Sequence, residues 1–313
     1  MVSSLKGRDF LSLADYNAEE LLFIINTAKL IKERFYSGER VLPVLAGRIL
    51  AMIFEKPSTR TRVSFEVAMK QLGGHAIYLS WRELQLARGE TISDTARTLA
   101  RYVDGIVARV YEHEKLEELA KYSDKPVING LSNLLHPVQA LSDVFTIMEK
   151  KGDLKKLKIV FVGDGGSNVA HSLLLGLTIL GSGITIACPK GYEPVKQIMD
   201  LYMEISRKTG GYVEIINDPV EAVKGADVVY TDVWISMGME AEAEKRLKDF
   251  AGFSVDSKLM SYAKPNAIFM HCLPAHRGME VTDEVIDGAW SVVWDQAENR
   301  LHLQKALLSL IIP

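Results

Sequence analysis

The stretch KIVFVGDGGSN, residues 158–168, passes from an apolar run through a glycine-rich turn and predicts a buried β-strand that leads into a helix. The stretch AMIFEKPSTRTRVSFE, residues 51–66, has the same order: an apolar run, a proline, then apolar side chains at helical spacing. Units of a strand followed by a helix build parallel sheets with helices on their faces. Together the two stretches predict an α/β fold.

Strand and helix patterns alternate along the rest of the chain. Candidate strands in the first half are residues 48–54, 76–79, 104–110 and 126–129. Candidate strands in the second half are residues 158–162, 184–188, 212–216, 227–231, 267–270 and 291–294. We therefore expect two Rossmann-like domains, each a parallel sheet flanked by helices.

A long helix predicted over residues 136–150 marks the expected domain boundary. We place the first domain at residues 1–150 and the second at residues 151–295. A last helical pattern has no strand of its own, so we expect residues 296–313 to pack back on the first domain.

Two further segments have clear local signals. Asn17 followed three residues later by Glu20 resembles a capping box and predicts a helix that reaches about Phe35. Residues 232–253 form a long connection with many charges, and connections of that length in compact domains are usually functional or mobile.

Composition excludes several classes of protein. The 313 residues suggest about two domains. The 40 acidic and 37 basic side chains give a net charge of -3, which provides no global attraction to nucleic acid or to an acidic membrane surface. The first residues lack the pattern of a secretory signal, and two cysteines argue against a disulfide framework, so we expect a cytoplasmic protein.

One segment without Asp, Glu, Lys or Arg, residues 165–189, needs a test for membrane character. Glycines open it and interrupt it again at residues 181–183, which leaves pieces too short to span a bilayer. We expect a buried helix followed by a buried strand.

The start of the helix predicted after residue 57 has the composition of an anion site. Ser58, Thr59 and Thr61 supply hydroxyl groups and Arg60 supplies a guanidinium beside the free N–H groups of a helix N-terminus. The alternative is an ordinary N-cap with solvated arginines. The two arginines in this turn favour the anion site.

Polar side chains also follow later strands of the first half. Arg109 ends one candidate strand, and His136 and Gln139 open the helix at the domain boundary. Taken alone, each is usually a surface charge or a satisfied polar group. Together they would stand at the carboxyl ends of parallel strands, where open α/β sheets bind ligands.

The glycine-rich turn after residue 162 does not predict a dinucleotide site. Asn168 replaces the third glycine of the fingerprint, and Cys188 and Pro189 stand where a ribose-binding carboxylate would be expected. We therefore expect no nicotinamide cofactor and hold an NAD-dependent dehydrogenase as a disfavoured alternative.

Two loops in the second half suggest an amine site. Asp232, Ser236 and Met237 follow a candidate strand and suit an ammonium-bearing ligand, although a polar loop beside a buried Trp would have the same composition. His271 and Cys272 follow another strand. They could be metal ligands or a Cys–His nucleophile pair, but the chain has no second Cys at zinc-site spacing.

Four motifs taken together resemble the carbamoyltransferases, and among them the ornithine-type enzymes. These motifs are STRTRVSFE at 58–66, HPVQ at 136–139, DVWISMG at 232–238 and HCLP at 271–274. The first two are shared with the aspartate-type enzymes and imply carbamoyl phosphate. The last two are the signatures of the ornithine type.

The resemblance implies roles for individual residues. Those holding the phosphate would be Ser58, Thr59, Arg60 and Thr61, and those addressing the carbamoyl group would be Arg109, His136 and Gln139. Those binding ornithine would be Asn168, Asp232, Ser236 and Met237, with Cys272, Leu273 and Arg300 at the reacting centre. Gln85 would reach a neighbouring subunit's site, which implies a homotrimer or an assembly of trimers. Val138 departs from the family's usual Cys or Thr.

The implied reaction is the direct attack of the δ-amine of ornithine on carbamoyl phosphate, giving citrulline and phosphate without a metal or an organic cofactor. Arg60, Arg109, His136 and Arg300 would stabilise the negative charge that develops. The alternatives are a carbamoyltransferase for putrescine or an acylated ornithine, and a non-enzymatic sensor of small ligands on the same kind of scaffold.

Overall fold

The computed structural model describes residues 4–235 and 240–313, which form two compact units. Unit 1 comprises Met1–Ser142 and Asn299–Pro313, and unit 2 comprises Asp143–Glu298. The units therefore divide inside two continuous helices, eight residues before the expected boundary at residue 150 and three after residue 296. Because neither helix changes composition at these points, no sequence signal marks the division.

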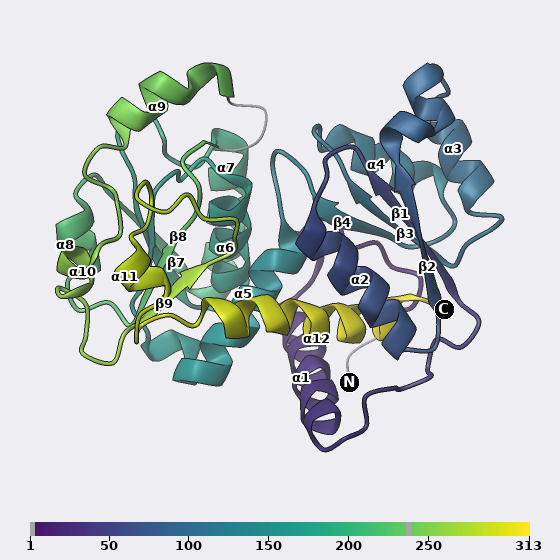
Figure 1. The fold of residues 1–313 in the computed structure, drawn as a ribbon, viewed down its shortest axis with the longest axis horizontal. Helices are drawn as coiled ribbons and strands as arrows, with labels where there is room; N and C mark the ends of the chain where they lie inside the picture. The colour runs from purple at the N-terminus through teal and green to yellow at the C-terminus, as the bar shows by residue number, and fades with distance from the viewer. Residues whose placement is uncertain (1–3, 236–239) are drawn as a thin grey trace. The chain divides into compact units, whose positions relative to one another are not determined.

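Unit 1 is built on a four-stranded parallel sheet in the order β2-β1-β3-β4 (Figure 1). Its strands are β1 (Ile49–Phe54), β2 (His75–Ser80), β3 (Gly105–Arg109) and β4 (Val127–Leu131). Its helices are α1 (Ala18–Tyr36), α2 (Thr59–Gln71), α3 (Ile92–Leu99), α4 (Glu114–Tyr122) and the first part of α5 (Pro137–Lys151), with short 3₁₀ turns η1 (Leu13–Asp15), η2 (Trp81–Glu83) and η3 (Gln85–Arg88).

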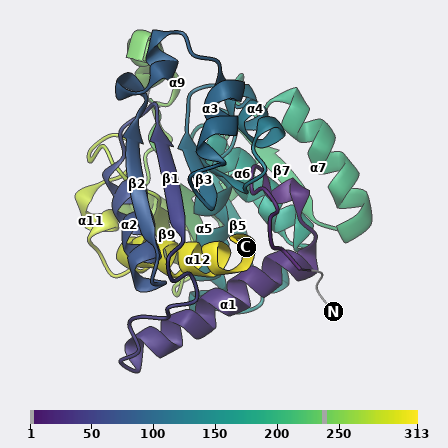
Figure 2. The same cartoon turned by 90° about the vertical axis from the view of Figure 1, so that its right-hand side faces the viewer.

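The core of unit 1 lies on both faces of this sheet, because its central strands β1 and β3 are buried except at Ile49, the first residue of β1. Ala51 and Ile53 of β1 pack with Ala96 of α3 and with Leu116 and Leu119 of α4. Helices α3 and α4 therefore cover one face, as Figure 2 also shows. A β-strand buried on both faces reads as a continuous apolar run, which explains the ILAMIF sequence of β1.

Unit 2 is built on a five-stranded parallel sheet in the order β7-β6-β5-β8-β9. Its strands are β5 (Ile159–Val162), β6 (Gly183–Ala187), β7 (Tyr212–Ile216), β8 (Val228–Thr231) and β9 (Ile268–His271). Its helices are α6 (Asn168–Ile179), α7 (Lys196–Thr209), α8 (Pro219–Val223), α9 (Ala243–Asp249), α10 (Ser257–Met260), α11 (Asp283–Ile286) and the start of α12 (Val293–Ile311), with 3₁₀ turns η4 (Leu154–Lys156) and η5 (Glu240–Glu242).

Helices cover both faces of the unit 2 sheet. Figure 1 shows α6 and α7 on one side and α8, α10 and α11 on the other. Val160 and Val229 of the sheet pack with Val223 of α8, Met260 of α10 and Ile286 of α11. Two open parallel sheets flanked by helices confirm the expected fold class.

The charge-free segment after Asp164 is a buried helix followed by a buried strand, as expected. Residues Val169 to Ile179 of α6 are all buried, and so is every residue of β6. Burial on every side explains why this helix carries no polar face. Within the described part of the chain, no helix is both long and apolar enough to cross a membrane.

The chain differs from the sequence-based expectation at two places. Residues 291–294 are not a strand: Ser291 forms an isolated bridge with Phe269, and α12 begins at Val293. The short apolar run there serves the first turn of a helix, an ambiguity that periodicity over four residues does not resolve. The connection over residues 232–253 also contains a helix, α9, which its dense charges concealed.

The last part of α12 belongs to unit 1, as expected for a C-terminal helix that packs back on the first domain. Gly7 donates a backbone hydrogen bond to Ile311, and Lys305 donates to Gln71 on α2. A Cβ at Gly105 of β3 would lie 3.4 Å from the side chain of Ile312. The chain end is therefore part of the core of unit 1.

Candidate active site

The carboxyl edge of the unit 1 sheet brings two of the predicted segments together. Phe54, the last residue of β1, pairs in register with Arg109, the last residue of β3. Residues that follow β1 therefore start beside Arg109, whose side chain is 6% exposed. The backbone N–H of Glu55 donates to the Arg109 carbonyl over 2.8 Å, which fixes the start of the STRTR segment.

Helix α2 begins in this segment. Ser58 is its N-cap and accepts a hydrogen bond from the backbone N–H of Thr61 over 3.3 Å. Thr61 is fully buried, Ser58 and Arg60 are half-buried, and Thr59 is exposed. The ordinary capping role of Ser58 and the anion site are thus compatible, since one cap leaves other N–H groups of the first turn unbonded within the helix.

Arg300 of α12 is joined to this site by two hydrogen bonds. Its Nη1 donates to Oε1 of Gln139 over 2.9 Å, and its Nη2 donates to Oγ1 of Thr61 over 3.1 Å. All three residues are at most 4% exposed. Both acceptors are neutral, so these two hydrogen bonds orient the guanidinium without placing a negative charge beside it.

His136 lies among the cations of unit 1. Burial lowers the pKa of its imidazole well below the usual range, and the positive charges of Arg300, Arg109 and Arg60 lower it further. The imidazole is therefore neutral at physiological pH and can donate a single N–H without adding charge.

These observations describe an anion site at the sheet edge. Three guanidinium groups, a neutral imidazole, the amide of Gln139 and the first turn of α2 converge there. Such a set suits a ligand with phosphate oxygens and an adjacent carbonyl.

Gln85 is separate from this cluster. It begins η3 and is exposed, while its neighbour Leu86 is buried. An exposed amide on an anchored turn is free to contact a second molecule.

In unit 2, register explains how distant segments meet. Thr231 of β8 pairs with Val162 of β5 on one side and with His271 of β9 on the other. The residues that follow these three strands therefore lie along one edge of the sheet. Asp232 comes directly after β8 and Cys272 directly after β9.

Strand β5, another of these three strands, leads to Asn168. After β5, Gly163 adopts a φ of 136°, which an L residue rarely tolerates, and the chain turns into α6. Ser167 caps α6 by accepting from the N–H of Ala170, so that Asn168 is the first helical residue and is half-buried.

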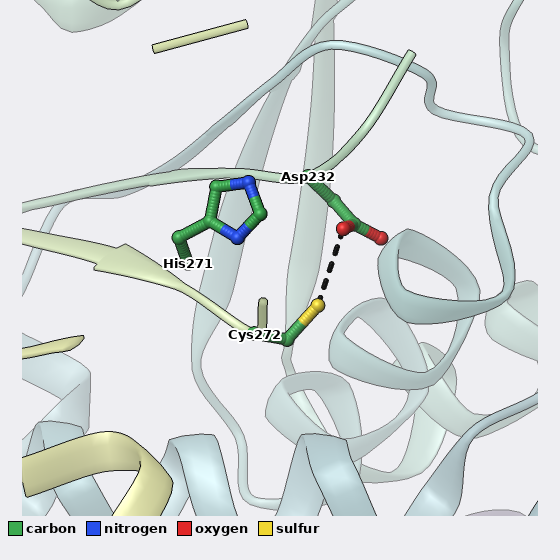
Figure 3. Close-up of side chains that lie close together, drawn as sticks. All are labelled: Asp232, His271 and Cys272. Carbon is green, nitrogen blue, oxygen red and sulfur yellow. Dashed lines mark hydrogen bonds between the residues drawn. The ribbon is translucent and has the colours of Figure 1, made fainter. Parts of the chain in front are cut away.

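Asp232 and Cys272 are hydrogen-bonded, as Figure 3 shows. The thiol Sγ donates to Oδ1 of Asp232 over 3.2 Å. Burial raises the pKa of the Asp232 carboxyl, and the hydrogen bonds from Cys272 and from the backbone N–H of Val233 oppose this shift. A carboxylate whose ionised form is disfavoured by burial gains most from a cationic ligand.

The thiol of Cys272 is not activated. Burial raises the pKa of Cys272 well above its usual value, and the charges of Asp232 and Asp143 raise it further. A nucleophilic cysteine requires the opposite shift, toward thiolate. Cys272 therefore acts as a hydrogen-bond donor, and the Cys–His nucleophile alternative is not supported.

His271 is engaged through both ring nitrogens. Its Nδ1 accepts from the N–H of Leu273 over 2.8 Å, and its Nε2 lies 3.2 Å from Oε1 of the buried Glu280. Ligand atoms of Asp232, His271 and Cys272 lie within 4.8 Å of one another. A metal there would have to displace these hydrogen bonds, so the cluster is better explained by its internal partners.

Leu273 completes the turn and adopts a φ of 61°. Ser236 and Met237 lie outside the described residues, so their predicted roles have no structural counterpart here.

The structure adds supporting residues that the sequence did not single out. Gln296 of α12 accepts from the N–H of His271 and donates to Asp143 and to the hydroxyl of Tyr230, all within unit 2. Arg246 and Asp164 form a buried ion pair. Neither set has a local motif, because its members are tens of residues apart in the chain.

Comparisons with known proteins identify the family of each half of the chain. Residues 8–149 match the family model described as the carbamoyl-P binding domain of aspartate/ornithine carbamoyltransferase, and residues 155–311 match its Asp/Orn binding domain. An ornithine carbamoyltransferase of Staphylothermus marinus is 69% identical over 314 residues, covering 100% of each chain. The anabolic ornithine carbamoyltransferase of Pyrococcus furiosus is 59% identical, covering 100% of this chain and 98% of its own.

Solved structures are similar over the same length. The ornithine carbamoyltransferase of P. furiosus superposes with a TM-score of 0.95 at 59% identity, covering 99% of both chains. The enzyme of Thermus thermophilus does so with a TM-score of 0.87 at 41% identity, covering 97% of this chain and 99% of its own. With both family models matched and these relatives similar over their whole length, the chain belongs to the aspartate/ornithine carbamoyltransferase family.

Proposed function

We propose that this protein transfers the carbamoyl group of carbamoyl phosphate to L-ornithine, giving L-citrulline and phosphate. The observation that carries the proposal is the division of charge between the units. Unit 1 gathers three guanidinium groups around His136, and unit 2 buries the carboxyl of Asp232 beside a thiol. The first arrangement suits a doubly anionic phosphate, and the second suits an amino acid with a positive charge.

Carbamoyl phosphate would bind to unit 1. Its phosphate oxygens would accept hydrogen bonds from the first turn of α2, from the hydroxyls of Ser58, Thr59 and Thr61, and from Arg60. Its carbonyl oxygen would face Arg109, His136 and Arg300, with Gln139 holding the guanidinium of Arg300. Because the imidazole of His136 is neutral, its N–H can polarise the carbonyl without also attracting the phosphate as a cation would.

Ornithine would bind to unit 2. Asn168, Asp232 and Cys272 follow three neighbouring strands and offer an amide, a carboxylate and a thiol donor. We propose that Asp232 holds an ammonium group, that Ser236 and Met237 complete the ornithine site, and that Leu273 lies with Cys272 at the reacting centre.

The reaction needs no covalent bond to the protein. The neutral δ-amine adds to the carbamoyl carbon, the carbonyl oxygen gains negative charge, and the C–O bond to phosphate then breaks. Each preorganised donor at that oxygen is worth about 3 to 4 kcal/mol of barrier. Because an alkyl ammonium has a pKa near 10, the amine must first lose one proton to solvent. The nitrogen loses a second proton after it has attacked, and the departing phosphate would accept that proton.

Further features follow from the same proposal. We propose a homotrimer, or an assembly of trimers, in which the exposed Gln85 contacts the carbamoyl phosphate site of a neighbour. Two free cysteines are consistent with a reducing cytoplasm. The P. furiosus relative is named anabolic, and we propose the same direction here, toward arginine biosynthesis.

The test is an assay of ureido products from carbamoyl phosphate with ornithine, aspartate or putrescine. We expect citrulline as the main product, together with one phosphate per citrulline. Carbamoylaspartate or carbamoylputrescine as the main product would overturn the choice of amine. Ligand binding without phosphate release would instead favour a sensor.

The role of the anion site is tested with Arg60→Ala. Loss of one charged donor at the phosphate should lower kcat/KM for carbamoyl phosphate by about a hundredfold or more. Arg101→Ala, an exposed arginine of unit 1, is the control. Near-normal kinetics of Arg60→Ala would remove Arg60 from the site.

A further inference from the structure

Arg246 of α9 is a buried cation in unit 2 that the reaction scheme leaves without a role. Arg246 is 4% exposed, and its guanidinium donates hydrogen bonds to two different residues. Nε donates to the carbonyl oxygen of Trp234 over 2.6 Å, and Nη2 donates to Oδ2 of Asp164. Burial of a guanidinium is costly unless such partners compensate it, so this geometry is strongly determined.

The two partners of Arg246 belong to the two segments that lead to the proposed ornithine site. Trp234 is two residues beyond Asp232 in the loop after β8. Asp164 is in the glycine-rich turn after β5, four residues before Asn168. One guanidinium therefore ties the backbone next to Asp232 to the turn that places Asn168.

Asp164 also orders its own turn. Its Oδ1 accepts from the N–H of Gly166 over 2.9 Å, while its Oδ2 is held by Arg246. Gly165 makes the tight packing of this turn possible, since a Cβ there would lie 2.8 Å from the carbonyl oxygen of Tyr192. The carboxylate thus bridges the turn and the cation.

Aromatic rings enclose the pair. The guanidinium lies 5.0 Å from the centroid of Tyr192 and 5.5 Å from that of Phe250, and Phe250 stacks on Trp234 at 5.7 Å. Tyr192 is held in turn by a hydrogen bond of its hydroxyl to Asp249. These contacts restrict the rotation of Arg246 and leave its fork aimed at both partners.

Arg246 also lies at the far end of the connection that follows Asp232. The chain between Trp234 and Arg246 carries Ser236 and Met237, the other two residues that the family resemblance assigns to ornithine.

We propose that Arg246, through its paired bonds to Trp234 and Asp164, is a positioning residue that sets the affinity for ornithine and not for carbamoyl phosphate. The inference rests on the proposed binding of ornithine by Asp232 and Asn168. Arg246 does not touch the substrate in this role; it holds the two segments that do.

The decisive variant is Arg246→Lys. An ammonium keeps the positive charge next to Asp164, so the buried carboxylate stays paired, but a single nitrogen cannot also serve the Trp234 carbonyl in the geometry of the fork. We expect KM for ornithine to rise about tenfold, with KM for carbamoyl phosphate and kcat within about threefold of the parent. Arg246→Met should raise KM for ornithine at least as much and should also lower Tm, because it leaves Asp164 buried without its cation.

Arg207→Lys, the same substitution at an exposed position of α7, is the matched control and should leave both KM values unchanged. Equal increases in both KM values, or an ornithine KM within about twofold of the parent in Arg246→Lys, would overturn the positioning role. If Arg246→Met does not fold, Arg246→Lys decides alone. Asp232→Asn separates a failure of this inference from a failure of the proposed ornithine site. If Asp232→Asn raises the ornithine KM and Arg246→Lys does not, only the positioning role of Arg246 is wrong. If neither variant raises the ornithine KM, the proposed ornithine site is wrong as well.

Discussion

Cys272 shows how burial decides the chemistry of a side chain whose sequence context admits several roles. In the sequence, Cys272 and the adjacent His271 could be a nucleophile pair or metal ligands. In the structure His271 uses its two nitrogens for Leu273 and Glu280, and the raised pKa of Cys272 keeps the sulfur protonated. What remains is a donor for Asp232, and this role does not require sulfur.

Cys272→Ser therefore tests the donor role. A serine hydroxyl can donate to Asp232, so we expect kcat/KM for ornithine to stay within about tenfold of the parent, whereas Cys272→Ala should lose more. Steady-state kinetics of the two variants make the comparison. If Cys272 were a covalent nucleophile, kcat/KM would fall about a thousandfold or more in either variant. Equal decreases of that size would refute the donor role.

His136 shows the same principle with the opposite sign of charge. Burial and three neighbouring guanidinium groups lower its pKa, so the folded protein resists the proton that the unfolded chain accepts near pH 6.5. As the pH falls below that value, the unfolded state binds a proton that the folded state does not. The free energy of unfolding must then decrease with decreasing pH on account of this group.

His136→Gln removes this proton linkage. Between about pH 6.5 and pH 5, the free energy of unfolding of the parent should fall more steeply than that of the variant, by up to about 1.4 kcal/mol per pH unit. Denaturant titrations at several pH values measure the two slopes. The exposed His75→Gln should keep the parent's slope, and identical slopes for parent and His136→Gln would contradict the buried neutral imidazole.

At the scale of elements, helix starts were the best-defined local signals. Asn17 caps α1 by accepting a hydrogen bond from the N–H of Glu20. The carboxylate of Glu20 accepts in turn from the N–H of Asn17 over 2.9 Å, as the capping box predicts. Glu20 also binds Arg8 at 2.5 Å, so this cap fastens the chain's N-terminal segment to α1.

Asn17→Ala should lower the free energy of unfolding by about 1 kcal/mol, because it leaves orphan N–H groups at the start of α1. Urea denaturation of the folded protein gives this difference. Asn26→Ala, at an exposed position within the same helix, is the control and should be neutral or slightly stabilising, since Ala has the higher helix propensity. An equal loss in both variants would show that the cap contributes nothing specific.

The element that the sequence misjudged lies next to one that it identified. The helix expected within residues 296–313 exists, but it begins at Val293, inside the four residues expected as a strand. A run of four residues, three of them apolar, has no period long enough to separate helix from strand. The bridge of Ser291 to Phe269 shows that extended pairing does occur there, for one residue only.

At the scale of the whole molecule, the proposed trimer makes the function of one chain depend on another. Gln85 is exposed on η3 and has no place in the cluster formed by Arg60, Arg109, His136 and Arg300. If it contacts a neighbour's carbamoyl phosphate, each site needs Arg60 from one subunit and Gln85 from the next.

Hybrid trimers test this sharing directly. Arg60→Ala and Gln85→Ala proteins should each have low activity, but unfolding and refolding an equimolar mixture should restore about a quarter of the parent activity, because a quarter of the sites then receive both intact residues. Refolded single variants are the controls, and light scattering verifies the trimer. Activity of the mixture equal to the mean of the two variants would place Gln85 in its own subunit's site or outside any site.

The sequence by itself determined the α/β class, nearly all of the strands and the capping box at Asn17, and it predicts an anion site and an amine site. These properties depend on local periodicity and on residue types within short motifs such as STRTR and HCLP. Family resemblance added the roles of individual residues, including Arg300, which has no motif of its own.

Only the tertiary structure decided which distant side chains meet and in what state of protonation. Parallel register placed Asp232 beside Cys272, and the return of α12 to unit 1 placed Arg300 on Thr61 and Gln139. The pKa of a group depends on its burial and on neighbours that are far away in the chain. The contacts of Arg246 are likewise decided by tertiary structure. Its two partners become neighbours only when strands β5 and β8 pair, and no local pattern of residues specifies that pairing.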